Sequence, residues 1–91
     1  MSIIERIREK IRRREYYLSS HAEDEMAEDE LERSDIENAI LNGHIDKKLT
    51  SDPRGTRYRV EGQAHDGRTI HVISRFKESN ALIIITVYDK G

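Results

Sequence analysis

The sequence contains no cysteine, which excludes a disulfide framework and any metal site built from thiolates. It also lacks long apolar runs, and none approaches the ~20 residues that a membrane-spanning helix needs. The charged start of the chain does not fit the apolar region of a signal peptide. We therefore expect a cytoplasmic protein that is neither exported nor embedded in a membrane.

The motifs of several enzyme classes are missing as well. The five glycines are scattered turn residues and build neither a phosphate-binding loop nor a dinucleotide fingerprint. No zinc motif and no nucleophile elbow is present. A chain of 91 residues forms one domain, 1–91, and buries only about two-thirds of its unfolded surface, so its core must be compact.

The net charge of −2 hides an uneven distribution of charge. Residues 21–37 carry nine Asp or Glu and one Arg, a net charge of −8, whereas the segments before and after them each carry +3. One interpretation is a solvated acidic helix. The other is that this helix lies away from a basic surface that meets phosphate or an acidic partner.

The first half of the chain has the pattern of three helices. Isoleucines recur every three or four residues among charged residues, which predicts an amphipathic helix over about residues 2–14. The spacing from Ser20 to Glu23 predicts a capping box that starts a second helix, and the spacing from Ser34 to Glu37 predicts one for a third. Gly43 follows the last apolar stripe and ends the third helix.

The second half changes to short β-prone runs separated by turns. We expect strands over about residues 45–49, 56–64, 69–76 and 81–88. Consecutive strands joined by short turns pair antiparallel. The predicted fold is therefore α+β, with three N-terminal helices packed on one face of a four-stranded antiparallel sheet. The last strand is apolar on both sides, so it should be central or covered.

The pairing of the second and third strands decides which side chains share a face, because a slip of one residue exchanges the two faces. A two-residue hairpin at Asp66-Gly67 would mix polar and apolar residues on each face. One bulge residue near the turn sorts them, so we prefer the bulged register. It gathers Tyr58, Val60, Ile70 and Val72 on one face, and Arg57, Arg59, His71 and Arg75 on the other.

The polar face has the residue types that metal-free RNA cleavage requires. The reaction needs a base for the 2′-hydroxyl proton, an acid for the leaving oxygen and cations for the phosphate. His71, Arg59 and Arg75, with Tyr88 near the rim, fill these roles without a metal or a cofactor. The candidate RNA-binding residues are Arg57, Arg59, Arg75, Lys47 and Lys48. The alternative is that these side chains are the cross-strand pairs of an ordinary exposed sheet face.

A helix would stack His21, Glu25 and Asp29 on one face, because they are four residues apart. They span about 12 Å at about 1.5 Å per residue, which is too far for one metal ion. At most, an adjacent pair could join ligands from elsewhere. The structural alternatives are a helical pair of Asp29 with Arg33, and a buried or N-terminal hydrogen bond for His21.

Five short runs occur in an order that resembles a bacterial family known as a domain of unknown function. The runs are His21-Ala22-Glu23-Asp24-Glu25-Met26-Ala27-Glu28-Asp29, Ala39-Ile40-Leu41-Asn42-Gly43, Asp52-Pro53-Arg54-Gly55-Thr56-Arg57-Tyr58, Asp66-Gly67-Arg68 and Ile84-Ile85-Thr86-Val87-Tyr88. The resemblance covers about residues 16–89. It divides the chain into an N-terminal amphipathic helix, 1–15, and a family core, 16–91.

Such domains resemble the RelE, MqsR and BrnT toxins of type II toxin-antitoxin systems, which are often encoded beside a zinc-finger antitoxin of the MqsA type. The resemblance implies a ribonuclease-like fold with RNA on the free face of the sheet and an antitoxin as partner. It implies that Tyr88 lies where these toxins have a tyrosine, and that Arg57, Arg59 and Arg75 lie where they have phosphate-binding arginines. His21 matches the family's own motif. The net negative charge departs from ribosome-dependent toxins, because phosphate affinity rests on Lys and Arg.

We therefore expect a metal-independent endoribonuclease that cuts single-stranded RNA, with Tyr88, Arg59, Arg75, His71 and His21 as candidate catalytic residues. A second hypothesis is a non-catalytic module that binds a partner, or forms a homodimer, through the first helix or an exposed sheet edge. A third is a toxin fold without activity. Variants of the catalytic candidates separate the first hypothesis from the other two.

Overall fold

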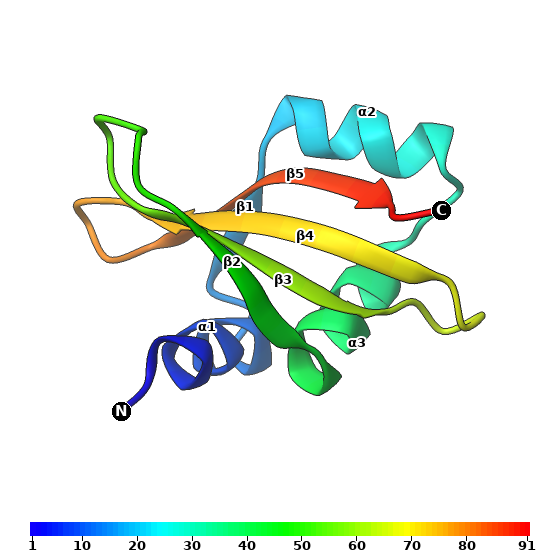
Figure 1. Cartoon of the computed structure of the whole chain (residues 1–91), viewed down its shortest axis with the longest axis horizontal. Helices are drawn as coiled ribbons and strands as arrows, with labels where there is room; N and C mark the ends of the chain where they lie inside the picture. Colours follow the sequence, from blue (N-terminus) through cyan, green and yellow to red (C-terminus); the bar gives the residue numbers. More distant parts are fainter.

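The computed structural model describes residues 1–91 as three helices and one five-stranded sheet (Figure 1). The helices are α1 (Ile3–Arg12), α2 (Ser20–Glu28) and α3 (Arg33–Asn42). The strands are β1 (Tyr16–Leu18), β2 (His44–Leu49), β3 (Arg57–Gln63), β4 (Thr69–Phe76) and β5 (Leu82–Asp89). The α+β class is confirmed, with all three helices in the first half of the chain.

The sheet has one strand more than the sequence predicts. Its order is β1-β5-β4-β3-β2, and all neighbours are antiparallel except β1 and β5, which are parallel. The predicted four-stranded antiparallel sheet is therefore wrong. Tyr16 is buried and Tyr17 is exposed, which is the alternation of a strand. Three residues are too few for this alternation to be predicted as a strand from sequence.

Two helix starts also differ from the prediction. Ser19, and not Ser20, caps α2, because its hydroxyl accepts a hydrogen bond from the Ala22 N–H at 3.0 Å. At the start of α3 the Glu32 N–H donates to the Asp35 carboxylate at 2.9 Å, two residues before the predicted capping box. This segment is rich in serine and acidic residues, so several pairs have the spacing of a capping box. The predicted end of α3 at Asn42 is confirmed.

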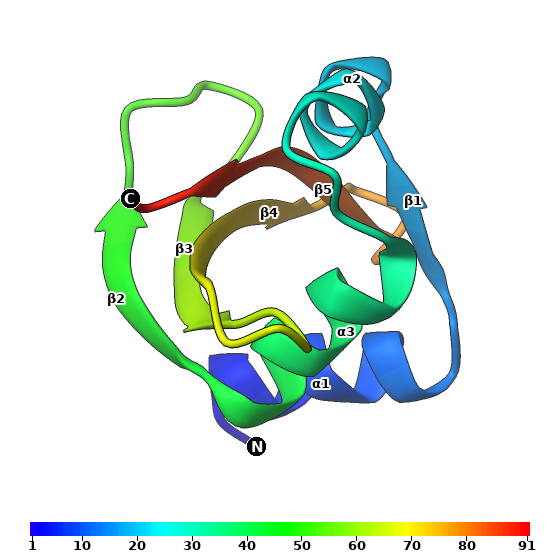
Figure 2. The ribbon, with the colours of Figure 1, turned by 90° about the vertical axis from the view of Figure 1, so that its right-hand side faces the viewer.

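The sheet curves around α3, and α1 lies against α3 on the same side (Figure 2). A core of 16 buried apolar residues fills this concave side. Ile7 and Ile11 of α1 belong to that core and are at most 2% exposed. Segment 1–15 is therefore an integral part of the domain. None of the three helices has the length and apolar character needed to cross a membrane.

The β3–β4 hairpin confirms the bulged register. Val60 pairs with Val72, and Arg59 pairs with Ile73. The turn has three residues and includes Gly67, whose φ of +89° is one that L side chains rarely adopt. The odd-numbered side chains of β3 and β4 therefore lie on the face away from α1 and α3, which we call the outer face.

Carboxylates of α2 replace a neighbouring strand along part of β5. Glu25 Oε1 accepts the Val87 N–H at 2.9 Å, and Asp29 Oδ2 accepts the Asp89 N–H at 3.3 Å. Four helical residues rise about 6 Å and two strand residues about 6.7 Å, so the two spacings match. The helix lies beside β5 on the side away from β4 (Figure 1). β5 is thus covered along both edges, as its apolar sequence predicts.

Candidate functional site

Three side chains on the outer face form one hydrogen-bonded chain, which we call the relay. His71 lies on β4 and has two direct cross-strand neighbours, Glu61 on β3 and Tyr88 on β5. Its Nδ1 lies 2.9 Å from the Tyr88 hydroxyl, and its Nε2 lies 3.0 Å from Glu61 Oε1. His71 is only 5% exposed, whereas Tyr88 is half-buried. Tyr88 therefore gives the buried imidazole its contact with solvent.

The Glu61 carboxylate determines where the protons of the relay lie. The Lys90 ammonium, at 2.8 Å, and then His71 hold the pKa of Glu61 below its ordinary value, so Glu61 is ionised at neutral pH. An ionised carboxylate can only accept hydrogen bonds, so His71 Nε2 carries a proton. In the neutral imidazole, Nδ1 then has the free lone pair and accepts a hydrogen bond from the Tyr88 hydroxyl.

Arg59 adds a fixed positive charge beside the relay. Its Nε and Nη2 donate to the two carboxylate oxygens of Asp46, both at 2.9 Å. Asp46 lies in the bulge of β2, between Ile45 and Lys47. Arg59 lowers the pKa of Asp46, while Asp46 and secondarily Tyr88 raise the pKa of Arg59 above its ordinary value. The guanidinium is therefore always charged and lies near the phenol.

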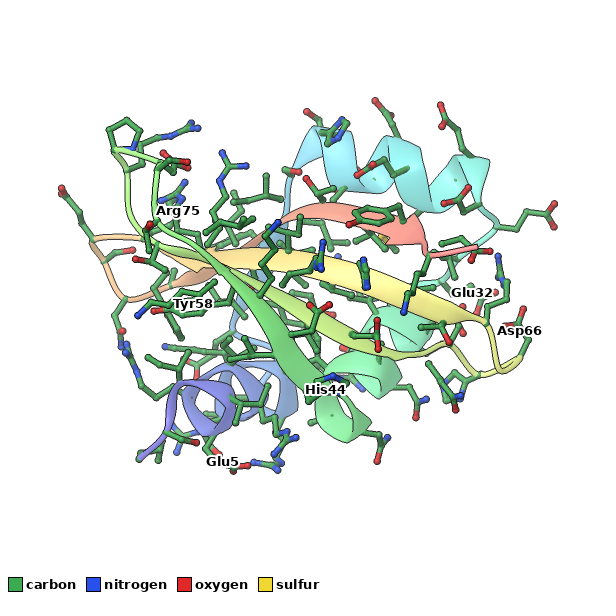
Figure 3. The ribbon with its side chains drawn as sticks, viewed as in Figure 1. Glu5, Glu32, His44, Tyr58, Asp66 and Arg75 are labelled. Atoms are coloured by element: carbon green, nitrogen blue, oxygen red, sulfur yellow. The ribbon has the colours of Figure 1, made fainter.

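The other predicted arginines lie at the opposite end of the outer face. Arg57 Nε donates to Asp52 Oδ2 at 2.7 Å, and Arg75 Nε lies 3.9 Å from the same oxygen. His71 and Arg75 are four residues apart along β4, about 13 Å at about 3.3 Å per residue. Figure 3 shows Arg75 beside the loop that joins β2 to β3. The structure thus brings Tyr88, His71 and Arg59 together but leaves Arg75 outside the relay.

His21 also lies outside the relay. Its side chain is 65% exposed on α2, and its Nε2 lies 3.3 Å from Glu25 Oε1. The expected buried or N-terminal hydrogen bond is wrong, since His21 makes an exposed pair within the helix. A helical pair of Asp29 with Arg33 is also wrong. The helix α2 ends before Asp29, and α3 begins at Arg33, so the two residues do not share a helix. His21 contacts Glu25, the residue that holds the strand bearing Tyr88.

The two candidate lysines lie on opposite faces. Lys47 pairs with Arg59 across β2 and β3, whereas Lys48 pairs with Tyr58. Both lysines are exposed, because β2 is an edge strand. Only Lys47 therefore shares the outer face with Arg59.

Sequence reasoning missed the acidic half of the site. Glu61 follows Arg59 by two residues on β3, so the same alternation that selected Arg59 could have found it. Asp46 has no such signal, because a bulge interrupts the alternation there. Lys90 follows the end of β5 and also carries no pattern.

Asp46, Glu61 and His71 have the spacing of metal ligands. Each offers one ligand atom, and these atoms lie within 4.8 Å of one another. Two carboxylates and an imidazole suit a divalent cation. Arg59 already binds both oxygens of Asp46, and Lys90 binds Glu61. A metal ion at this place would have to compete with both of these cations.

The Tyr88 end of the relay lies on an open surface. Glu61 lines a polar cavity of about 390 Å³, but no cavity of the molecule has Tyr88, His71 or Arg59 in its lining. Small-molecule sites are usually concave and apolar. An open polar sheet face fits an extended polymer better than a small enclosed ligand.

Two of the runs noted in the sequence have structural roles beyond the relay. The run over residues 21–29 forms α2, which buries Ala22 and Met26 and caps the edge of β5. The run over residues 66–68 closes the β3–β4 hairpin, and the Arg68 guanidinium donates to the Asp29 carbonyl at 2.5 Å. These residues hold together the elements on which the relay lies.

Residues 18–89 match the model of one protein family, described as a domain of unknown function, DUF4258. No curated protein and no solved structure matches the chain. The matched residues include the whole relay, together with Arg59 and Asp46, and leave out α1 and most of β1. Because the match covers most of its length, the chain belongs to the DUF4258 family.

Proposed function

We propose that the protein is a metal-independent endoribonuclease that cuts single-stranded RNA, with Tyr88, His71 and Arg59 as its catalytic residues. The observation that carries this proposal is the hydrogen-bonded order of phenol, imidazole and carboxylate. The Arg59 guanidinium lies beside it, because its partner Asp46 is 3.7 Å from His71 Nε2. Ordinary cross-strand pairs account for an exposed arginine and aspartate. They do not require a buried histidine between a tyrosine and a glutamate.

The geometry supports a proton transfer through Tyr88. Its oxygen takes the 2′-hydroxyl proton while its own proton passes to His71 Nδ1, and Glu61 stabilises the imidazolium that forms. The 2′-oxygen attacks the adjacent phosphorus, and Arg59 stabilises the charge on the pentavalent phosphate. The bond to the 5′-oxygen breaks, and that oxygen takes a proton from a water molecule. The hydroxide left behind recovers a proton from the His71 imidazolium through Tyr88, which resets the relay. The products are a 2′,3′-cyclic phosphate and a 5′-hydroxyl.

The surroundings of the relay support the choice of substrate and partner. The outer face is open, so a single strand can lie across it without an enclosed pocket. The resemblance to RelE, MqsR and BrnT toxins supports the same reaction, a cytoplasmic site of action and an antitoxin partner of the MqsA type. An antitoxin that covered Tyr88 and Arg59 would block the reaction.

The experiment that tests the proposal compares two tyrosine variants on the same sheet. Tyr88→Phe removes the phenol of the relay, whereas Tyr58→Phe makes the same change on the core side. Each protein is incubated with a labelled single-stranded RNA in the presence of EDTA or of Mn²⁺. In a second assay, each protein is expressed in bacteria and growth is measured after induction. We expect wild type and Tyr58→Phe to cut RNA in EDTA, and Tyr88→Phe to be at least about 100-fold slower.

Two outcomes would overturn the proposal in different ways. If folded wild type cuts no RNA and leaves growth unchanged, the chain is a binding module or an inactive fold. If EDTA abolishes cutting and Mn²⁺ restores it, the reaction is metal-dependent, and Asp46, Glu61 and His71 are its ligands.

A further inference from the structure

We propose that Arg54, Arg75 and Lys77 form a phosphate-binding subsite, the basic corner, for the RNA strand at a distance from the cut. The identity of this ligand rests on the proposed function. The basic corner itself rests on a cavity, an unpaired buried donor and a local excess of positive charge. Sequence reasoning selected only Arg75 of the three, and it placed Arg75 among both the catalytic and the RNA-binding residues.

A cavity of about 520 Å³ lies at this end of the outer face, and no hydrophobic residue lines it. Its lining consists of Arg54, Arg75, Lys77, Glu78 and Ser79. Arg75 comes from β4, Lys77 follows that strand, and Arg54 comes from the loop between β2 and β3. Three cations from two segments, the end of β4 and the β2–β3 loop, therefore line one cavity. Figure 3 labels Arg75, which lies beside that loop.

The loop between β2 and β3 folds over the stem of Arg75. Gly55 has a φ of +135°, and a Cβ built on it would lie only 3.5 Å from Arg75 Cδ. Asp52 holds the loop from inside, because its carboxylate accepts the Arg54 N–H at 2.9 Å and its own side chain is 6% exposed. The loop therefore fixes both arginines beside the cavity.

Arg75 Nε is buried and has no hydrogen-bond partner. The nearest carboxylate oxygen, Oδ2 of Asp52, is 3.9 Å away, and it accepts a hydrogen bond from Arg57 Nε at 2.7 Å. The Arg54 backbone and then Arg57 hold the pKa of Asp52 far below its ordinary value, so Asp52 is already satisfied. A buried guanidinium donor without a partner is a group that an oxyanion can satisfy.

The charges of this region do not cancel. Arg54, Arg57, Arg75 and Lys77 are four cations, while Asp52 and Glu78 are two anions, which leaves a net charge of +2. Lys77 forms no ion pair, and its ammonium lies 5.5 Å above the ring of the exposed Tyr17. An excess of positive charge around a cavity favours phosphate.

The distance between the basic corner and the relay indicates which phosphate of the RNA strand the corner binds. Arg75 lies about 13 Å along β4 from His71, at about 3.3 Å per residue. Adjacent phosphates of an extended strand are closer together than this. The basic corner therefore binds a phosphate beyond those that flank the cut, and it contributes to affinity for a strand of several nucleotides.

The experiment uses the double variant Arg54→Gln/Lys77→Gln, because both side chains are exposed, and thermal melting checks that the variant folds. Arg13→Gln on α1 is the matched control, since Arg13 is 66% exposed and pairs only with Glu9. Cleavage of a dinucleotide and of a six-nucleotide RNA with the same cut site is measured. For the hexanucleotide we expect KM to rise about tenfold with kcat unchanged, and for the dinucleotide no change.

Binding of a DNA hexanucleotide, which lacks the 2′-hydroxyl, separates failure of this inference from failure of the proposed function. If wild type cuts no RNA but the double variant binds this DNA about tenfold more weakly than Arg13→Gln, the basic corner stands and the nuclease proposal falls. Equal DNA binding by the two variants overturns the basic corner. A fall in kcat on the dinucleotide also overturns it, because the corner would then act in the reaction itself.

Discussion

The two ends of the outer face differ in whether their charged and polar groups have partners. At the relay, Arg59 and Lys90 balance Asp46 and Glu61, and the His71 ring has a partner at each nitrogen. Around the basic corner, Asp52 and Glu78 offset only two of four cations, which leaves a net charge of +2, and Arg75 Nε has no partner. Satisfied hydrogen bonds fix positions, whereas unsatisfied charge attracts a ligand. One end is therefore suited to moving a proton, and the other to holding a charged chain.

The largest effect should come from removing the proton acceptor of the relay. His71→Gln keeps a polar side chain of similar size but cannot accept the Tyr88 proton, so we expect kcat to fall by about 10²–10⁴ with KM nearly unchanged. Arg75→Gln should instead raise KM for long RNA. Steady-state kinetics on one RNA, with thermal melting to show that both variants fold, measures the contrast. Equal losses of kcat in both variants would contradict the assignment of catalysis to the relay and of binding to the basic corner.

The position of Tyr88 depends on the neighbouring helix, because Tyr88 lies between the two β5 residues that α2 caps. Glu25→Ala leaves the Val87 N–H without its acceptor and should lower the free energy of unfolding by about 1–2 kcal/mol. Glu23→Ala is the control, since Glu23 is exposed on the same helix. Urea denaturation compares the two variants. No difference between them would mean that water replaces the carboxylate at this edge.

Salt should weaken binding mainly through the basic corner. Affinity for single strands falls with log[salt] with a slope of about 0.7 per phosphate contact, so Arg54→Gln/Lys77→Gln should lower the magnitude of the slope by about 0.7 to 1.4. Asp46→Asn leaves Arg59 without its carboxylate, and it should not lower the magnitude of this slope. Fluorescence anisotropy of a labelled DNA hexanucleotide between low and physiological salt gives both slopes. An unchanged slope in the double variant would show that the corner makes no phosphate contact.

The smallest effect should be a loss of folding stability at acidic pH. The pKa of Glu61 is lowered from an ordinary value of 4.5 in the folded chain, so its stabilising contribution is complete above pH 4.5 and is lost as the pH falls further. Wild type should therefore lose stability below this pH more steeply than Glu61→Gln. Thermal melts between pH 3 and 7 test this, and parallel curves would mean that Glu61 has the same pKa folded and unfolded.

The regular elements of the site could be predicted from sequence, and its irregular ones could not. Alternation along β3 and β4 placed Arg59 and His71 on one face, because the hairpin at Gly67 fixed the register. Asp46 projects from a bulge, which no alternation shows. Arg54 lies in a loop whose path over the sheet depends on tertiary contacts, and such a path leaves no periodic signal.

The assignment of His21 shows the limit of motif reasoning. His21 is a catalytic candidate because it matches the family's motif, but α2 uses this face to hold the β5 edge. The equal rise of four helical and two strand residues explains the i, i+4 acids without any ligand. A motif can therefore recur for a purely mechanical reason.

The cover that α2 and β1 place on β5 also limits how folded chains can associate. A sheet grows by adding strands at open edges, and here β2 is the one long edge that remains free. Two copies joined through β2 would use up that edge in both, so their association would end at a closed pair and could not continue into a fibre. Because α2 and β1 cover the β5 side of the sheet, further strands can be added only at β2.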